Sequence, residues 1–119
     1  MVSVLLIDDD PVAAKLLKGF LAFRFGDRCD VVHASTLTSA LRVLRQRRFD
    51  HVLLDNRLPP YTDYRETLPL VRNEAGGTEP IIVSVSPDDG CFDERAAFGA
   101  PRLVDKFALR AAIGAGLLG

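Results

Sequence analysis

The sequence predicts one α/β domain: a parallel β-sheet with helices on both faces. Five short apolar runs alternate along the chain with segments of helical periodicity. Several of these runs are continuously apolar, which is typical of strands that are covered on both faces. The chain has 119 residues, of which 48% are hydrophobic and 26% are charged. These values are typical of a globular domain, so we expect a single domain over residues 1–119.

The expected strands end at polar residues or turn formers. They are Val2 to Ile7, Cys29 to Ala34, His51 to Leu54, Ile81 to Val85, and a short strand containing Leu103 and Val104. Because crossovers between parallel strands are right-handed, few topologies remain, and we expect the flavodoxin-like order 2-1-3-4-5. In that order the first and third strands are neighbours, at the point where open α/β sheets bind ligands.

Five helices are expected between and after these strands, and the first two have clear end signals. Pro11 opens the first helix with Asp10 as its cap, and Gly26 ends it. Ser35 or Thr36 caps the second helix. The apolar positions of the first helix recur at helical spacing: Ala13, Leu16, Leu17, Phe20 and Leu21.

The other three helices have weaker signals. The third contains Pro69, so we expect it either to begin late, with Thr67 as its cap, or to be kinked. The fourth, Asp88 to Phe98, is short and poorly patterned. The last, Phe107 to Leu118, is weakened by glycines such as Gly114.

Composition excludes several classes of function. The net charge of −1 gives no reason to expect direct nucleic-acid binding or attachment to an anionic membrane. Cys29 and Cys91 have no metal-ligand spacing, so we expect free thiols in a reducing cytoplasm. The first apolar run is short and ends in acids, unlike a signal peptide, and no run is long enough to span a bilayer.

Chemically informative residues follow four of the five strands. Asp8 and Asp9 follow the first strand, Asp55 follows the third, a serine lies near the end of the fourth, and Lys106 follows the fifth. All are expected at one edge of the sheet. Neighbouring carboxylates there repel each other unless a cation binds, and Mg²⁺, which prefers oxygen ligands, is the natural candidate.

This ordered set resembles the receiver domain of bacterial two-component response regulators, over essentially the whole chain. The matching segments are LLIDDD, LLDNRLPP and GAPRLVDK. The resemblance implies a phosphorelay in which Asp55 accepts a phosphoryl group from a phosphohistidine and later loses it by slow hydrolysis. It implies that Mg²⁺ is held by Asp8, Asp9, Asp55 and the backbone carbonyl of Arg57. It also implies that Lys106 pairs with a phosphoryl oxygen.

The resemblance further implies a hydroxyl that binds the phosphoryl group and switches a protein-interaction surface. Counting back from Lys106 reaches Ser84, whereas Ser86 better matches the end of the strand. Counting forward from Asp55 reaches Val85, between the two. Both serines therefore remain candidates, with a weak preference for Ser84.

The implied partners are a histidine kinase or a histidine phosphotransfer protein as phosphodonor, and an unknown downstream protein. We expect a monomer or weak dimer, with no direct contact to nucleic acid or membrane. With no output domain in the chain as given, the output would be a protein contact or phosphate relay. The family places that contact on the face formed by the fourth helix, fifth strand and fifth helix.

Three departures from the family pattern indicate a divergent output face. Phe107 follows the lysine where the family usually has proline, and Leu103 replaces an aromatic residue that reports the switch. The loop from Pro60 to Tyr64 lacks the usual glycines.

Two other functions fit parts of the pattern. In a phosphatase of the haloacid dehalogenase type, Asp8 would be the nucleophile and Asp10 the general acid/base. That family's acidic pair after the lysine is missing, since residues 107–119 contain no Asp or Glu, and Asp55 would have no role. The third hypothesis is a receiver-like binding module that is never phosphorylated. Any catalysis would be limited to phosphorylation and dephosphorylation of Asp55 itself.

Overall fold

The computed structural model describes residues 1–119 and contains a five-stranded parallel sheet in the order β2-β1-β3-β4-β5. The predicted fold class and strand order are therefore confirmed. The strands are β1 (Val2–Ile7), β2 (Cys29–Ala34), β3 (His51–Asp55), β4 (Ile81–Ser84) and β5 (Arg102–Asp105). Their apolar residues are almost all inaccessible in β1, β3 and β4, because these three strands lie in the middle of the sheet.

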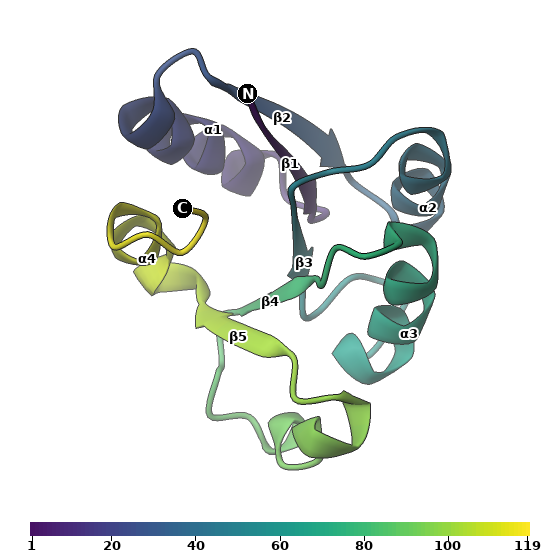
Figure 1. Ribbon diagram of the computed structural model, residues 1–119. Coiled ribbons are helices and arrows are strands. Elements are labelled where there is room, and N and C mark those ends of the chain that lie inside the picture. Colours follow the sequence, from purple (N-terminus) through teal and green to yellow (C-terminus); the bar gives the residue numbers. More distant parts are fainter.

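Four α-helices connect the strands or follow them, one fewer than expected. They are α1 (Pro11–Phe25), α2 (Leu37–Gln46), α3 (Tyr64–Ala75) and α4 (Leu109–Gly114). Helices α2 and α3 cover one face of the sheet and α1 and α4 cover the other, as Figure 1 shows. Each face has its own buried core, because successive strand residues point to opposite sides. Helices thus cover both faces of the sheet and leave its two edges uncovered.

The predicted fourth helix, Asp88 to Phe98, is wrong. This segment forms two short 3-10 turns, η1 (Gly90–Phe92) and η2 (Arg95–Phe98). It has no continuous apolar stripe, and the carboxylate of Asp89 caps the N–H of Cys91 at 3.2 Å, which starts a short turn instead. The turns are anchored by the fully buried Tyr64, whose ring stacks on Phe92 and meets Phe98 edge-on.

Helix α3 begins at Tyr64, so its cap lies four residues earlier than the predicted cap, Thr67. Asp63 is the cap: its carboxylate accepts the N–H of Arg65 at 2.9 Å and also binds the Arg65 guanidinium. Pro69 lies inside the helix. The missed signal was Asp63 followed by Glu66 three positions later, a spacing typical of a helix start.

The last helix is also shorter than predicted. A 3-10 turn, η3 (Lys106–Ala108), precedes α4, which ends at Gly114 rather than near Leu118. Glycine is a poor helix former, so the two glycines after Ile113 account for the early end. Since α1 has 15 residues and α4 has only six, α4 covers only part of α1. None of the helices is both long enough and apolar enough to cross a lipid bilayer.

Candidate functional site

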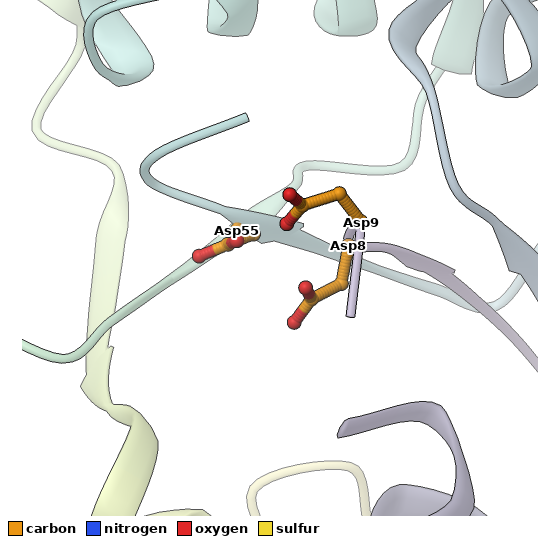
Figure 2. A group of neighbouring side chains, drawn as sticks. All are labelled: Asp8, Asp9 and Asp55. Carbon is orange, nitrogen blue, oxygen red and sulfur yellow. The ribbon is translucent and has the colours of Figure 1, made fainter. Parts of the chain in front are cut away.

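Three carboxylates meet at the edge of the sheet where β1 and β3 end. The register pairs Ile7 with Leu54, so Asp8 and Asp55 follow as neighbours. Asp9 extends from the same loop, and Figure 2 shows the three side chains gathered together. A ligand oxygen from each of Asp8, Asp9 and Asp55 lies within 4.8 Å of the other two. The predicted convergence of these acids is therefore seen in the structure.

The acids differ in burial, and burial changes their acidity. Asp8 is 2% exposed and Asp55 is 8% exposed, whereas Asp9 is exposed to solvent. Burial raises the pKa of Asp55 to about 7, and the negative charge of Asp8 adds to the rise. The positive charge of Lys106 partly opposes it. Ionisation of Asp55 at neutral pH therefore costs free energy. A cation bound beside the carboxylate would remove this cost.

Lys106 brings a positive charge to the same cluster. Its ammonium donates a hydrogen bond of 2.8 Å to Oδ2 of Asp8. Burial alone would lower the pKa of Lys106, but the hydrogen bond to Asp8 and the charge of Asp55 outweigh burial and raise it. Lys106 stays protonated and reaches the acids from the end of β5, as the sequence predicted.

The backbone around Asp8 is held by two further residues. The N–H of Asp10 donates to Oδ1 of Asp8 at 2.9 Å, and Oδ1 of Asp10 accepts the N–H of Val12 at 2.9 Å. The predicted capping role of Asp10 is thus confirmed. The Nε2 atom of His33 lies 2.6 Å from the carbonyl oxygen of Asp8. Sequence reasoning gave His33 no part in the site, although a polar residue near the end of the neighbouring strand was a signal.

Asn56, which no pattern in the sequence singled out, fixes the chain after Asp55. Asn56 is 1% exposed, and its Oδ1 accepts the backbone N–H of Tyr64 at 3.0 Å. Its amide nitrogen lies 3.8 Å from Sγ of Cys91. The next residue, Arg57, pairs through its guanidinium with Asp89. The segment after Asp55 is therefore tied directly to η1.

The two candidate serines occupy different environments. Ser84 ends β4 and is 1% exposed, whereas Ser86 lies beyond the strand and is exposed. The N–H of Ser86 donates to Oγ of Ser84 at 3.1 Å, and neither hydroxyl makes a hydrogen bond to Asp55. Val85 is 48% exposed and lines a hollow together with Asp8 and Lys106. The structure thus brings the three acids and Lys106 together, but leaves the hydroxyl outside the cluster.

The composition of the cluster suits a hard divalent cation. It offers carboxylate oxygens from Asp8, Asp9 and Asp55, and Mg²⁺ is usually held by one or two carboxylates together with water. The exposure of Asp9 leaves one side of the cluster open to solvent, where water ligands would lie. The residues therefore fit the metal that the sequence analysis expected.

A family comparison agrees with this geometry. The profile of the response regulator receiver domain matches residues 4–113, which is most of the chain. This chain belongs to the response regulator receiver domain family, whose members act in two-component signalling. The phosphatase hypothesis is therefore set aside, and the cap made by Asp10 explains the third acid without a catalytic role.

A characterised relative and several solved structures are similar to this receiver domain. The transcriptional regulatory protein MalR of Bacillus subtilis (strain 168) is 28% identical over 100 residues, which are 84% of this chain and 42% of MalR. The chain thus spans less than half the length of that relative.

The chemotaxis protein CheY4 of Vibrio cholerae has a TM-score of 0.75 at 21% identity, covering 97% of this chain and 98% of CheY4. The response regulator TrrA of Thermotoga maritima, solved with Mg²⁺ and BeF, has a TM-score of 0.75 at 20% identity and full coverage of both chains. The receiver domain of the histidine kinase PA1611 of Pseudomonas aeruginosa PAO1, solved with magnesium in its active site cleft, has a TM-score of 0.71 at 22% identity. It covers 98% of this chain and 93% of that one. These likenesses support the fold.

Proposed function

We propose that this receiver domain accepts a phosphoryl group on Asp55 from a phosphohistidine of a histidine kinase or a histidine phosphotransfer protein. The observation that carries the proposal is the meeting of Asp8, Asp9 and Asp55 within 4.8 Å, with the ammonium of Lys106 bound to Asp8. A receiver needs a carboxylate nucleophile flanked by groups that neutralise the incoming phosphate, and this cluster provides both.

The transfer exchanges one bond to phosphorus for another. An oxygen of Asp55 forms a bond to phosphorus while the bond from phosphorus to the imidazole nitrogen of the donor breaks. The freed imidazole takes up a proton. The transition state is loose and depends mainly on positioning and charge neutralisation, so a weak carboxylate nucleophile is sufficient. Asp55 must be ionised to attack, and its raised pKa means that a nearby cation increases the reactive fraction.

Each neighbouring residue has a distinct part in this reaction. Asp8, Asp9, Asp55 and the backbone carbonyl of Arg57 would hold Mg²⁺. The bound ion would offset the repulsion between the acids and the phosphoryl group. Lys106 is already protonated and lies beside the acids, so its ammonium would pair with a phosphoryl oxygen.

The hydroxyl of Ser84 is proposed to bind another phosphoryl oxygen once Asp55 is modified. It lies at the end of β4, and its oxygen accepts the N–H of Ser86, which leaves its proton free to donate. Ser86 is the alternative. A shift of this segment would be passed to the exposed turns η1 and η2 and alter a surface available to a downstream protein.

The test is incubation of the 119-residue chain with Mg²⁺ and acetyl phosphate, followed by mass spectrometry for one added phosphoryl group. We expect an acid-stable, base-labile adduct that disappears in Asp55→Ala and forms more slowly in Asp8→Ala. Asp27→Asn, an exposed aspartate far along the chain from the site, is the matched control and should react like the wild type. Because the chain has no tryptophan, Mg²⁺ binding is measured by calorimetry or NMR rather than by fluorescence.

Other results would change the assignment. An adduct that survives Asp55→Ala and is lost in Asp8→Ala would make Asp8 the nucleophile. The absence of both an adduct and Mg²⁺ binding would instead indicate a receiver-like binding module that is not phosphorylated.

A further inference from the structure

The backbone carbonyl of Asp8 lies where two neighbouring strands separate. Ile7 of β1 pairs with Ala34 of β2, and the N–H of Asp8 continues the ladder by donating to the carbonyl of Ala34 at 3.1 Å. In a parallel ladder the next bond would run from the N–H of Thr36 to the carbonyl of Asp8. Thr36 caps α2 instead, and its N–H donates to Oγ of Ser39 at 3.3 Å. The carbonyl of Asp8 is therefore left without its partner from the ladder.

The side chain of His33 takes the place of that missing bond. His33 lies on β2, where it pairs with Leu6 of β1, and its Nε2 atom lies 2.6 Å from the carbonyl oxygen of Asp8. A carbonyl oxygen can only accept a hydrogen bond, so Nε2 carries the proton and donates it. The backbone of Asp8 is thus held at both its N–H and its carbonyl by residues at the end of β2.

This bond holds the peptide group that joins the first two acids after β1. The carbonyl of Asp8 and the N–H of Asp9 belong to one planar group, so a donor that fixes the carbonyl also fixes the direction of the chain toward Asp9. The carboxylate of Asp8 has its own supports, since its oxygens accept the N–H of Asp10 at 2.9 Å and the ammonium of Lys106 at 2.8 Å. The exposed carboxylate of Asp9 makes no hydrogen bond within the protein. Its place in the cluster therefore depends on its backbone.

We propose that His33 is a positioning residue for the Mg²⁺ site: it holds the peptide between Asp8 and Asp9 so that the carboxylate of Asp9 stays beside the other acids. This role rests on the proposed binding of Mg²⁺ at the cluster, and it adds a residue that does not itself touch the metal. Metal ligands commonly depend on neighbouring groups that orient them. Without the bond from His33, the peptide could turn and carry Asp9 away, while Asp8 would remain bound to Lys106.

Substitutions at position 33 separate the hydrogen-bond donor from the ring that carries it. Glutamine has an amide donor at about the reach of Nε2, asparagine has the same amide on a shorter side chain, and leucine has no donor. All three are uncharged, so comparisons among them involve no difference in charge. His51→Leu is the matched control, because His51 is also half-buried but begins β3, at the opposite end of the sheet from the acids.

An NMR titration of the 119-residue chain with Mg²⁺ tests this role, because it follows the resonances of the folded protein. We expect His33→Leu and His33→Asn each to weaken Mg²⁺ binding by about tenfold, as loss of a group that orients a metal ligand does. His33→Gln restores the donor, so its affinity should stay close to that of the wild type. His51→Leu should bind Mg²⁺ like the wild type.

Two further measurements separate positioning from a general loss of structure. In the metal-free protein, the amide resonance of Asp9 should shift in His33→Leu and return toward its wild-type position in His33→Gln. With acetyl phosphate, the Mg²⁺ concentration that gives half the maximal phosphorylation rate should rise in His33→Leu, whereas the rate at saturating Mg²⁺ should change little. A general loss of structure would instead lower the rate at every Mg²⁺ concentration.

Three outcomes would overturn the role of His33. In the first, His33→Leu binds Mg²⁺ as tightly as the wild type. In the second, His33→Gln loses as much affinity as His33→Leu, so that the ring rather than its donor is what the site requires. Both of these outcomes leave the proposed phosphorylation of Asp55 in place. In the third, the wild type itself binds no Mg²⁺, which would contradict the proposed metal site together with the role of His33.

Discussion

The ammonium of Lys106 donates a 2.8 Å hydrogen bond to Oδ2 of Asp8, a residue 98 positions earlier in the chain. The contact joins the ends of β1 and β5, which are not adjacent in the sheet. Asp8 is almost completely buried, so this lysine supplies the positive charge that makes its ionised form tolerable. The same pair defines one side of the proposed phosphoryl site.

Replacing Lys106 by glutamine is expected to reduce both stability and phosphorylation. The buried Asp8 would lose its cationic partner, and unfolding in urea should show a loss of about 1–3 kcal/mol. Mg²⁺ should recover part of that loss, because a cation at the acids replaces the missing charge. Lys15→Gln, an exposed lysine on α1, is the control and should change neither quantity. Equal destabilisation with and without Mg²⁺ would argue against metal binding at this cluster.

The raised pKa of Asp55 predicts how stability depends on pH in the absence of Mg²⁺. The pKa is about 7 in the folded protein, and the ordinary value of 3.8 applies to the unfolded chain. The folded state therefore holds the proton more tightly, so the free energy of unfolding should fall as pH rises from about 4 to about 7. Asp55→Asn removes this dependence and should be more stable than the wild type at pH 8, by about 1–3 kcal/mol.

Urea unfolding of both proteins at several pH values provides the measurement. The difference between the two curves isolates Asp55 from other titrating groups. Saturating Mg²⁺ should reduce the difference, because it stabilises the ionised wild-type carboxylate. If the free energies of unfolding of the wild type and Asp55→Asn differ by the same amount at every pH, Asp55 is ionised as easily in the folded protein as in water.

The sequence was sufficient to predict the parts of this site that depend on sheet topology. Asp8 and Lys106 directly follow strands, Asp9 comes one residue later, and Asp55 ends a strand, so strand order alone brings them to one edge. His33 and Asn56 were missed because their roles depend on side-chain contacts with the carbonyl of Asp8 and the N–H of Tyr64. Such contacts leave no periodic pattern in a sequence.

The errors in helix prediction have similar physical causes. The segment of η1 and η2 is held by tertiary contacts rather than by its own periodicity: Tyr64 stacks on Phe92, and the guanidinium of Arg72 binds the carbonyl of Phe98. Leu16 was counted with the apolar positions of α1 but lies on its exposed face. Apolar spacing predicted the helix correctly, but it could not show that two opposite faces of the helix are apolar.

The contacts between Tyr64 and η1 predict a local rather than global role for the Tyr64 hydroxyl. The hydroxyl donates to the carbonyl oxygen of Cys91 at 3.1 Å inside the protein. Tyr64→Phe keeps the ring stacking on Phe92 and removes only this bond, so it should cost about 1 kcal/mol. Hydrogen exchange should become faster in residues 88–99 and stay unchanged in β1 and β3. Faster exchange throughout the sheet would mean that the hydroxyl stabilises the whole fold instead.

The assignment of the hydroxyl to Ser84 gives the last prediction. Ser84→Ala removes the only buried hydroxyl at the end of β4, whereas Ser86→Ala removes an exposed one. If Ser84 binds a phosphoryl oxygen, Ser84→Ala should weaken beryllofluoride binding in the presence of Mg²⁺ by about tenfold, equivalent to one charge-assisted hydrogen bond. Ser86→Ala should bind like the wild type.

Calorimetric titration of the three proteins measures this binding, and ¹⁹F NMR of the bound fluoride gives a second readout. Val85→Thr adds a further variant, because Val85 lines the hollow that contains Asp8 and Lys106. A threonine there would bring a hydroxyl to the acids from the position between the two serines. If Val85→Thr strengthened binding while Ser84→Ala left it unchanged, the wild-type site would work without a hydroxyl from β4. Binding lost only in Ser86→Ala would move the assignment to Ser86.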